Sequence, residues 1–131
     1  MHLKAQSWLS PVGASIEAIR ELQSEVEGLP SEYIELLREG NGGEVGLKVN
    51  PFNLCLDSAE DALDYWRSGT YTMKGVFVFG GNGGGVLFAF DMRTPGVLPV
   101  ISYDPIDPEG NIENVASSFD KLISLIEEED A

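Results

Sequence analysis

One stretch decides the fold class of this chain: residues 76–91, which read VFVFGGNGGGVLFAFD. Val76–Phe79 is an apolar run rich in residues that favour strands, and apolar side chains alternate from Val86 onward. Between the two runs lies the pair Asn82-Gly83, which is favoured in tight hairpin turns because both residues tolerate a positive φ. The stretch therefore predicts a β-hairpin at the centre of the chain.

The glycine cluster at 80–85 has a second possible meaning, a phosphate-binding loop. Such a loop ends in Gly-Lys-Ser/Thr and leads into a helix whose N-terminal amides hold the phosphate. Here that ending is missing, and the following residues have the pattern of a strand. A hairpin turn or bulge is therefore favoured, and close approach of a partner's backbone remains open because glycine permits it.

Shorter strands are predicted on both sides of the hairpin. Apolar residues alternate over 45–49 and again over 52–56, with Pro51 between the two stretches. Cys55 has no basic neighbour in sequence and is expected to be a small core residue. The stretch Val97–Ile101 carries Pro99, which predicts an edge strand or a bulge because proline cannot donate to the ladder.

Four helices are predicted from apolar residues at helical spacing and from their end signals. The apolar stripe of the first helix begins at Ile16, and Ser58 is placed to cap the third. These elements do not alternate as βαβ units do, so the chain is predicted to be α+β, with helices packed on a mainly antiparallel sheet. The predicted helices are Ser15–Glu27, Ser31–Glu39, Ser58 to about Arg67 and Ser117–Glu128.

Composition fits one domain over residues 1–131, ending in an acidic tail at 127–131. The chain has 22 acidic and 8 basic side chains, a formal charge of −14. That sign argues against a nucleic-acid partner, because binding a phosphate backbone requires cations. A basic protein partner would be steered toward such a surface, although solubility alone could also explain the charge.

The sequence also limits where the protein acts. No stretch is apolar and long enough to suggest a signal peptide or a membrane span, so no membrane partner is expected. The single cysteine, Cys55, excludes an internal disulfide framework and fits a reducing compartment. A cytoplasmic location is therefore predicted.

Catalysis finds little support in the sequence. The one histidine, His2, lies near the N-terminus, so neither a Ser-His nor a Cys-His pair can be assembled. Acidic residues over 104–113 invite a calcium interpretation but lack the spacing of an EF-hand loop, which favours a solvated acidic loop. The chain is therefore expected to be no enzyme and to need no cofactor or metal.

Two groups of acids are instead candidates for contact with a protein partner. One lies on the predicted middle helix, followed by aromatic residues that suit an interface. Tyr65 and Trp66 point about 100° apart on a helix, so we expect one in the core and the other as an exposed anchor. The other group lies in the predicted loop at 104–113. The predicted partner-binding residues are Asp61, Asp64, Trp66, Tyr71, Asp104, Asp107 and Glu109.

The order of three motifs resembles the SUKH superfamily of Smi/Knr-like domains. The first is Leu29-Pro30-Ser31-Glu32-Tyr33 with Asn41-Gly42-Gly43, similar to the LP-x-x-Y and NGG signature of that family. The second is the glycine-rich hairpin with Phe88-Ala89-Phe90-Asp91. The third is Val115-Ala116-Ser117-Ser118-Phe119, similar to the closing helix. Together these motifs extend over about residues 15–126, nearly the whole chain.

The resemblance implies a curved central sheet flanked by helices and a non-enzymatic role. Bacterial members of the superfamily look like immunity proteins that bind and neutralise a cognate toxin, often a nuclease. Fungal members act as regulators of cell-wall synthesis, and such a regulatory scaffold is the alternative function. The resemblance assigns no partner-binding residue, and it makes the LP-x-x-Y and NGG residues part of the structural framework.

Overall fold

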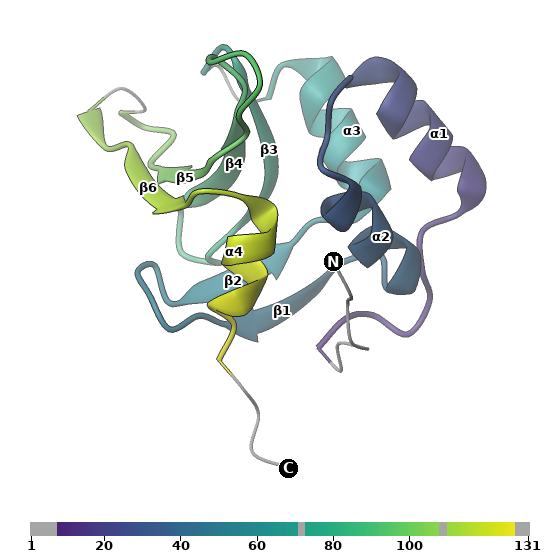
Figure 1. Ribbon diagram of the computed structural model, residues 1–131, viewed down its shortest axis with the longest axis horizontal. Helices are drawn as coiled ribbons and strands as arrows, with labels where there is room; N and C mark the ends of the chain where they lie inside the picture. Colours follow the sequence, from purple (N-terminus) through teal and green to yellow (C-terminus); the bar gives the residue numbers. More distant parts are fainter. Residues whose placement is uncertain (1–7, 71–72, 108–109, 128–131) are drawn as a thin grey trace.

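The computed structural model of the chain describes residues 8–70, 73–107 and 110–127. The fold is α+β, as predicted: an antiparallel sheet of six strands curls into a half-barrel and carries four helices. Figure 1 shows α1, α2 and α3 grouped beside the curled sheet and α4 in front of it. The elements are α1 (Ile16–Glu25), α2 (Ser31–Glu39), β1 (Gly43–Gly46), β2 (Asn53–Leu56), α3 (Ala59–Ser68), β3 (Val76–Gly81), β4 (Leu87–Asp91), β5 (Val100–Tyr103), β6 (Glu113–Ala116) and α4 (Phe119–Ser124).

The central hairpin is confirmed as β3 and β4, which pair antiparallel from Val76↔Asp91 to Gly81↔Leu87. Asn82 organises the turn, because its Oδ1 accepts hydrogen bonds from the amides of Gly84 at 2.8 Å and Val86 at 3.0 Å. The glycine cluster is thus a hairpin turn built on an asparagine side chain.

The C-terminal half of the sheet differs from the prediction in two places. The strand predicted over Val97–Ile101 is observed as β5 at Val100–Tyr103, an inner strand between β4 and β6, so an edge position for it was wrong. The alternative, a bulge, agrees with the register shift at Val100/Ile101 in its pairing with β6. Pro99 precedes the strand, and its carbonyl accepts from the amide of Asp91 at 2.9 Å. The edge strand on this side of the sheet is β6, which was not predicted and lies between the predicted acidic loop and the predicted last helix. Its side chains are half-buried or exposed, which explains its weak apolar signal.

Segments near the two ends of the described residues pair with β1 and with the residue that follows it. Leu9 forms a bridge with Gly43, and Ile126 forms one with Leu47. The amide of Lys48 also donates to the carbonyl of Leu125 at 2.8 Å. This pairing corrects two predictions: the last helix stops at Ser124 rather than Glu128, and the strand predicted over 45–49 ends at Gly46.

The helices begin within one or two residues of the predicted starts, and Ser58 caps α3 as predicted. Hydroxyl groups of Ser15, Ser58 and Ser118 each accept a hydrogen bond from the amide three residues later. The bounds of α2 are as predicted. The apolar stripe of α1 is narrower than predicted: Ile16 in the first turn is 71% exposed, whereas Ile19 and Leu22 are buried.

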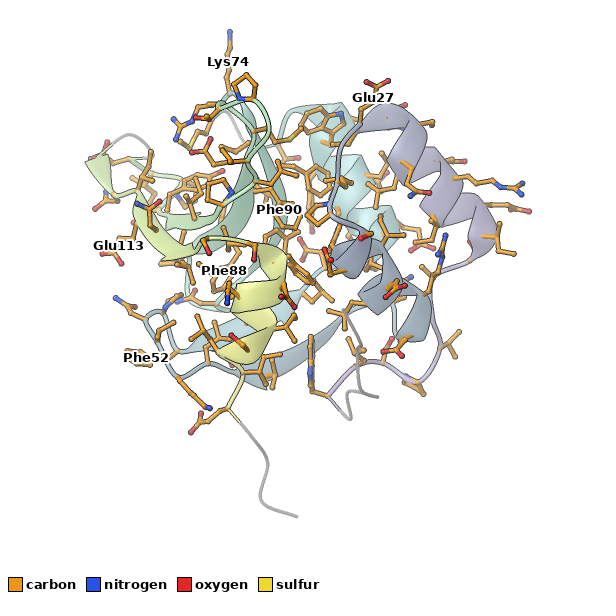
Figure 2. All side chains as sticks on the ribbon, in the orientation of Figure 1. Glu27, Phe52, Lys74, Phe88, Phe90 and Glu113 are labelled. Carbon is orange, nitrogen blue, oxygen red and sulfur yellow. The ribbon has the colours of Figure 1, made fainter. Side chains whose placement is uncertain are left out.

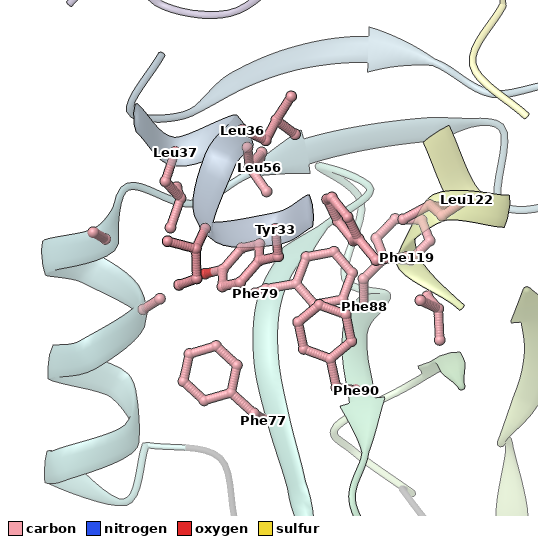
Figure 3. Packing of buried hydrophobic residues seen from close by; sticks show 14 of the residues in the cluster. Tyr33, Leu36, Leu37, Leu56, Phe77, Phe79, Phe88, Phe90, Phe119 and Leu122 are labelled. Atoms are coloured by element: carbon pink, nitrogen blue, oxygen red, sulfur yellow. The ribbon is translucent and has the colours of Figure 1, made fainter. Parts of the chain in front are cut away.

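The main core lies between the helices and one face of the sheet. Tyr33 of α2 stands at its centre, with the rings of Phe79, Phe90 and Phe119 within 5.8 Å of its own ring centroid. Figure 3 shows these rings meeting between α2, the hairpin strands and α4. The second motif of the family resemblance therefore supplies aromatic side chains to the core.

The opposite face of the sheet carries a second apolar cluster, since side chains alternate along each strand. Two predictions for the neighbouring β2 region were wrong. Cys55 is only half-buried, because it faces away from the main core. Phe52 is 63% exposed, because its φ of 69° places it in the turn before the strand. The second cluster consists of Met73, Val76, Val78, Ala89, Ile101 and Tyr103.

Candidate protein-interaction surface

The NGG motif fixes the start of α3. The side chain of Asn41 accepts a hydrogen bond from the amide of Ala59 at 2.7 Å and donates one to Glu60 Oε1 at 2.7 Å. Gly42 has a φ of +107°, and a Cβ added there would lie only 3.0 Å from the carbonyl oxygen of Leu56, so glycine is favoured at this position. The motif thus holds the N-terminus of α3 against the end of β2.

This attachment orients α3. Its buried residues are Ala59, Ala62 and Leu63, and the carboxylates of Glu60, Asp61 and Asp64 lie on the exposed side. Asp57 lies just before the helix and is half-buried. The name acidic α3 surface is used below for Asp57, Glu60, Asp61, Asp64 and Trp66.

Charge accumulates at the N-terminal part of this surface. Burial first, and then the nearby Asp61 carboxylate, raise the pKa of Asp57 to about 6. The pKa of the Tyr65 hydroxyl is also raised, by Asp57 first, then by burial, Asp61 and Asp64. Burial is thus the main cause for Asp57, whereas neighbouring carboxylates are the main cause for Tyr65.

The aromatic residues of α3 are only partly as predicted, since neither is fully buried. Tyr65 is half-buried, and Trp66 is 40% exposed although its ring centroid lies 5.7 Å from that of Phe77. One face of the Trp66 indole therefore packs on the core, and the rest is available to a partner. Tyr71, the other predicted anchor, lies outside the described residues.

A pocket of about 230 Å³ opens beside these aromatics, between the C-terminal half of α3 and the start of β3. The sequence pattern did not indicate it, because its walls come from a helix, a turn and a strand. Figure 2 shows Lys74 at this end of the molecule, extending away from its body. We call this cavity the Trp66 pocket. Its lining residues are Tyr65, Trp66, Met73, Lys74, Gly75, Val76 and Val78.

The cation on α3 is already engaged. Arg67 donates two hydrogen bonds to Glu25 Oε1, at 3.2 and 3.1 Å, and lies 3.6 Å from Glu21. These contacts join α3 to α1 on the side of the helix away from the Trp66 pocket. The guanidinium of Arg67 is therefore directed to the two glutamates of α1.

The second group of predicted residues lies elsewhere on the molecule. Asp104 and Asp107 follow β5, which is separated from β3 and its neighbour α3 by strand β4. Figure 1 shows the β5–β6 connection and α3 on opposite sides of the sheet. Asp104 caps its own turn by accepting from the amide of Ile106 at 2.9 Å. The structure does not join the two acidic groups, and Glu109 lies outside the described residues.

The described residues offer little for catalysis. Burial, followed by Glu44 and Asp57, raises the pKa of the Cys55 thiol, which disfavours its reactive thiolate form. In the part of the chain that the structure describes, no group of three or more His, Cys, Asp or Glu side chains could hold a metal ion. His2 and residues 128–131 of the predicted tail are outside it. None of the helices described is long and apolar enough to cross a membrane.

A second groove, of about 570 Å³, lies between the α1–α2 turn, the 92–98 loop and the start of α4. Its walls include the carboxylates of Glu27 and Glu32 and the apolar side chains of Val97 and Leu98. Figure 2 shows Glu27 at the same end of the molecule as Lys74. The groove was not predictable from the sequence, because its residues are far apart in the chain.

Comparison with known proteins agrees with this fold. The model of the SMI1 / KNR4 family (SUKH-1) matches residues 13–125. No curated protein matches the sequence. The matched region includes all of the described helices and strands, and domains of this family are generally non-enzymatic binding proteins. The chain belongs to the SMI1/KNR4 (SUKH-1) family.

Proposed function

We propose that this SUKH domain is an immunity protein of the cytosol that binds and neutralises a cognate toxin domain through the acidic α3 surface. One observation carries the proposal: helix α3, which is firmly anchored to the sheet, carries exposed carboxylates on its outer side and, at its C-terminal end, a partly exposed tryptophan where the helix meets the core. Aromatic anchors supply most of the energy in many interfaces, and charge sets the rate of encounter.

A basic toxin, such as a nuclease, is the partner that this surface fits. A nuclease must attract phosphate backbones, so its active face carries cations. The acidic α3 surface would attract the same cations and could cover that face. Asp104 and Asp107 would add to the attraction from a distance, since they lie beyond β4.

The alternative is a regulatory scaffold of the kind involved in control of cell-wall synthesis. The same surface could serve it, because protein binding is common to both functions. The nature of the partner is what separates the two.

Co-expression provides the test. The protein would be produced together with any toxin domain that a neighbouring gene encodes, with growth and complex formation as readouts. We expect growth to be restored and the complex to survive size-exclusion chromatography. A toxin that stays active and unbound would overturn the immunity function, and co-purification of a cell-wall enzyme instead would support the scaffold.

A further inference from the structure

We propose that the Trp66 pocket receives one large apolar side chain of the protein partner, and that an arginine or lysine next to that side chain contacts the acidic α3 surface. This inference rests on the proposed function, since it requires a protein partner. Beyond the proposed function, it specifies the chemistry of the partner segment that the pocket would bind.

The size and walls of the pocket define the apolar part of this segment. A cavity of about 150 Å³ is enough for a benzene-sized ring, and the Trp66 pocket has about 230 Å³. Its walls are mainly the side chains of Met73, Val76 and Val78 and the rings of Tyr65 and Trp66. Methionine and aromatic walls adapt to the shape of an inserted side chain. A leucine, methionine or phenylalanine fits such a site.

The charges around the Trp66 pocket define which partner residue can lie next to the inserted apolar side chain. The Tyr65 ring forms one wall, and its hydroxyl is in the field of Asp57, Asp61 and Asp64. Lys74, the cation at the pocket, extends away from the body of the molecule (Figure 2). A basic residue on the partner would therefore meet carboxylates on the α3 side of the pocket, and an acidic residue would be repelled there.

The second groove is a weaker candidate for the same segment. Glu32 lies in the first turn of α2, where the partial positive charge of the helix N-terminus offsets its carboxylate. The groove is also lined by Gly28, Pro95 and Gly96, which belong to turns and offer little side-chain area. It serves instead as an internal reference for binding elsewhere on the surface.

A peptide titration followed by NMR tests the proposal on the intact protein. The probe is a glycine–serine peptide with one leucine between two arginines. Two matched peptides replace the leucine by alanine or both arginines by glutamate. The readouts are the methyl signals of Met73, Val76 and Val78 for the pocket, and those of Met92, Val97 and Leu98 for the second groove.

We expect the arginine–leucine peptide to shift the pocket methyl signals in proportion to its concentration. The alanine peptide should bind about 10-fold more weakly, as for loss of a moderate anchor residue. The glutamate peptide should give no shift. In the protein, Asp61→Asn/Asp64→Asn should weaken binding more than the matched pair Glu35→Gln/Glu39→Gln on the exposed face of α2.

Shifts confined to the second groove, or equal binding of the arginine and glutamate peptides, would overturn the proposal. So would equal binding of the leucine and alanine peptides. These results are distinguishable from failure of the immunity function. A protein that protects against the toxin without binding the peptide contradicts only the pocket, and one that binds the peptide without protecting contradicts only the immunity function.

Discussion

Asn41 holds the first turn of α3 through both atoms of its side-chain amide, since Oδ1 accepts from the amide of Ala59 and Nδ2 donates to Glu60, each at 2.7 Å. The two residues at the helix start are 18 and 19 positions away in sequence. The NGG motif therefore acts on the candidate surface by positioning α3.

Replacing this side chain should destabilise the fold. We expect Asn41→Ala to lower the free energy of unfolding by about 1–2 kcal/mol, since it removes a helix-capping bond and a charge-assisted one. Urea denaturation followed by circular dichroism measures the change. Glu60→Gln is the control, because its amide oxygen can still accept from Asn41, and it should change stability by much less. An Asn41→Ala variant as stable as the wild type would show that the motif does not hold α3.

Removing the Tyr33 hydroxyl, unlike removing the Asn41 side chain, should not destabilise the fold. Tyr33 is fully buried among aromatic rings, and no hydrogen bond to its hydroxyl is found among the described residues. A buried polar group without a partner costs free energy, so Tyr33→Phe should leave stability unchanged or raise it by about 1 kcal/mol. Tyr33→Ala should instead cost about 3–5 kcal/mol, because it opens a cavity. Thermal unfolding distinguishes the two, and a strongly destabilised Tyr33→Phe variant would mean that the hydroxyl is satisfied.

The raised pKa of Asp57 makes the stability of the fold depend on pH. This pKa is about 6 in the folded protein, against about 3.9 for an unperturbed aspartate. A carboxyl group whose pKa is raised by folding binds its proton more tightly in the folded state. Its contribution to stability is therefore complete below about pH 4 and is lost as the pH rises through 6. With allowance for its partial exposure, the loss is about 1–2 kcal/mol.

Removing this charge should accordingly stabilise the protein at neutral pH. Asp57→Asn is expected to raise the free energy of unfolding at pH 7 by about 1–2 kcal/mol and to leave it nearly unchanged at pH 4. Denaturation curves at the two pH values provide the comparison. Asp61→Asn should have a smaller effect in the same direction, since Asp61 is the lesser cause of the shift. A gain in stability of equal size at both pH values would contradict the raised pKa of Asp57.

The parts of the fold that were predicted correctly are those whose signals are local. Hairpin β3–β4 has its turn residues between two apolar runs, and α2 lies between Pro30 and Gly40. The errors come from contacts distant in sequence. Leu125–Glu127 has helical spacing, but its backbone pairs with Gly46–Lys48 and ends α4 early. Strand β6 is acidic and partly exposed, so only its pairing with β5 identifies it.

The candidate surface was predictable to a similar extent. Acids followed by aromatics on the predicted middle helix indicated α3, and the structure places Asp61, Asp64 and Trp66 on that helix, with Trp66 at the pocket. The pocket itself was not predictable, because Met73, Val76 and Val78 read as ordinary strand and turn residues. That Asp104 and Asp107 lie apart from α3 follows only from the strand order.

The association rate of the protein with its toxin domain, measured by stopped-flow over a range of salt concentrations, tests the role of the acidic α3 surface most directly. For the wild type we expect a rate that falls as salt screens the charges. Asp61→Asn/Asp64→Asn should associate about 5-fold more slowly at low salt, with a flatter salt dependence. Asp104→Asn/Asp107→Asn, which removes the same charge elsewhere, should have a smaller effect. Equal association rates for the wild type and Asp61→Asn/Asp64→Asn at every salt concentration would contradict a role for the acidic α3 surface in binding the toxin.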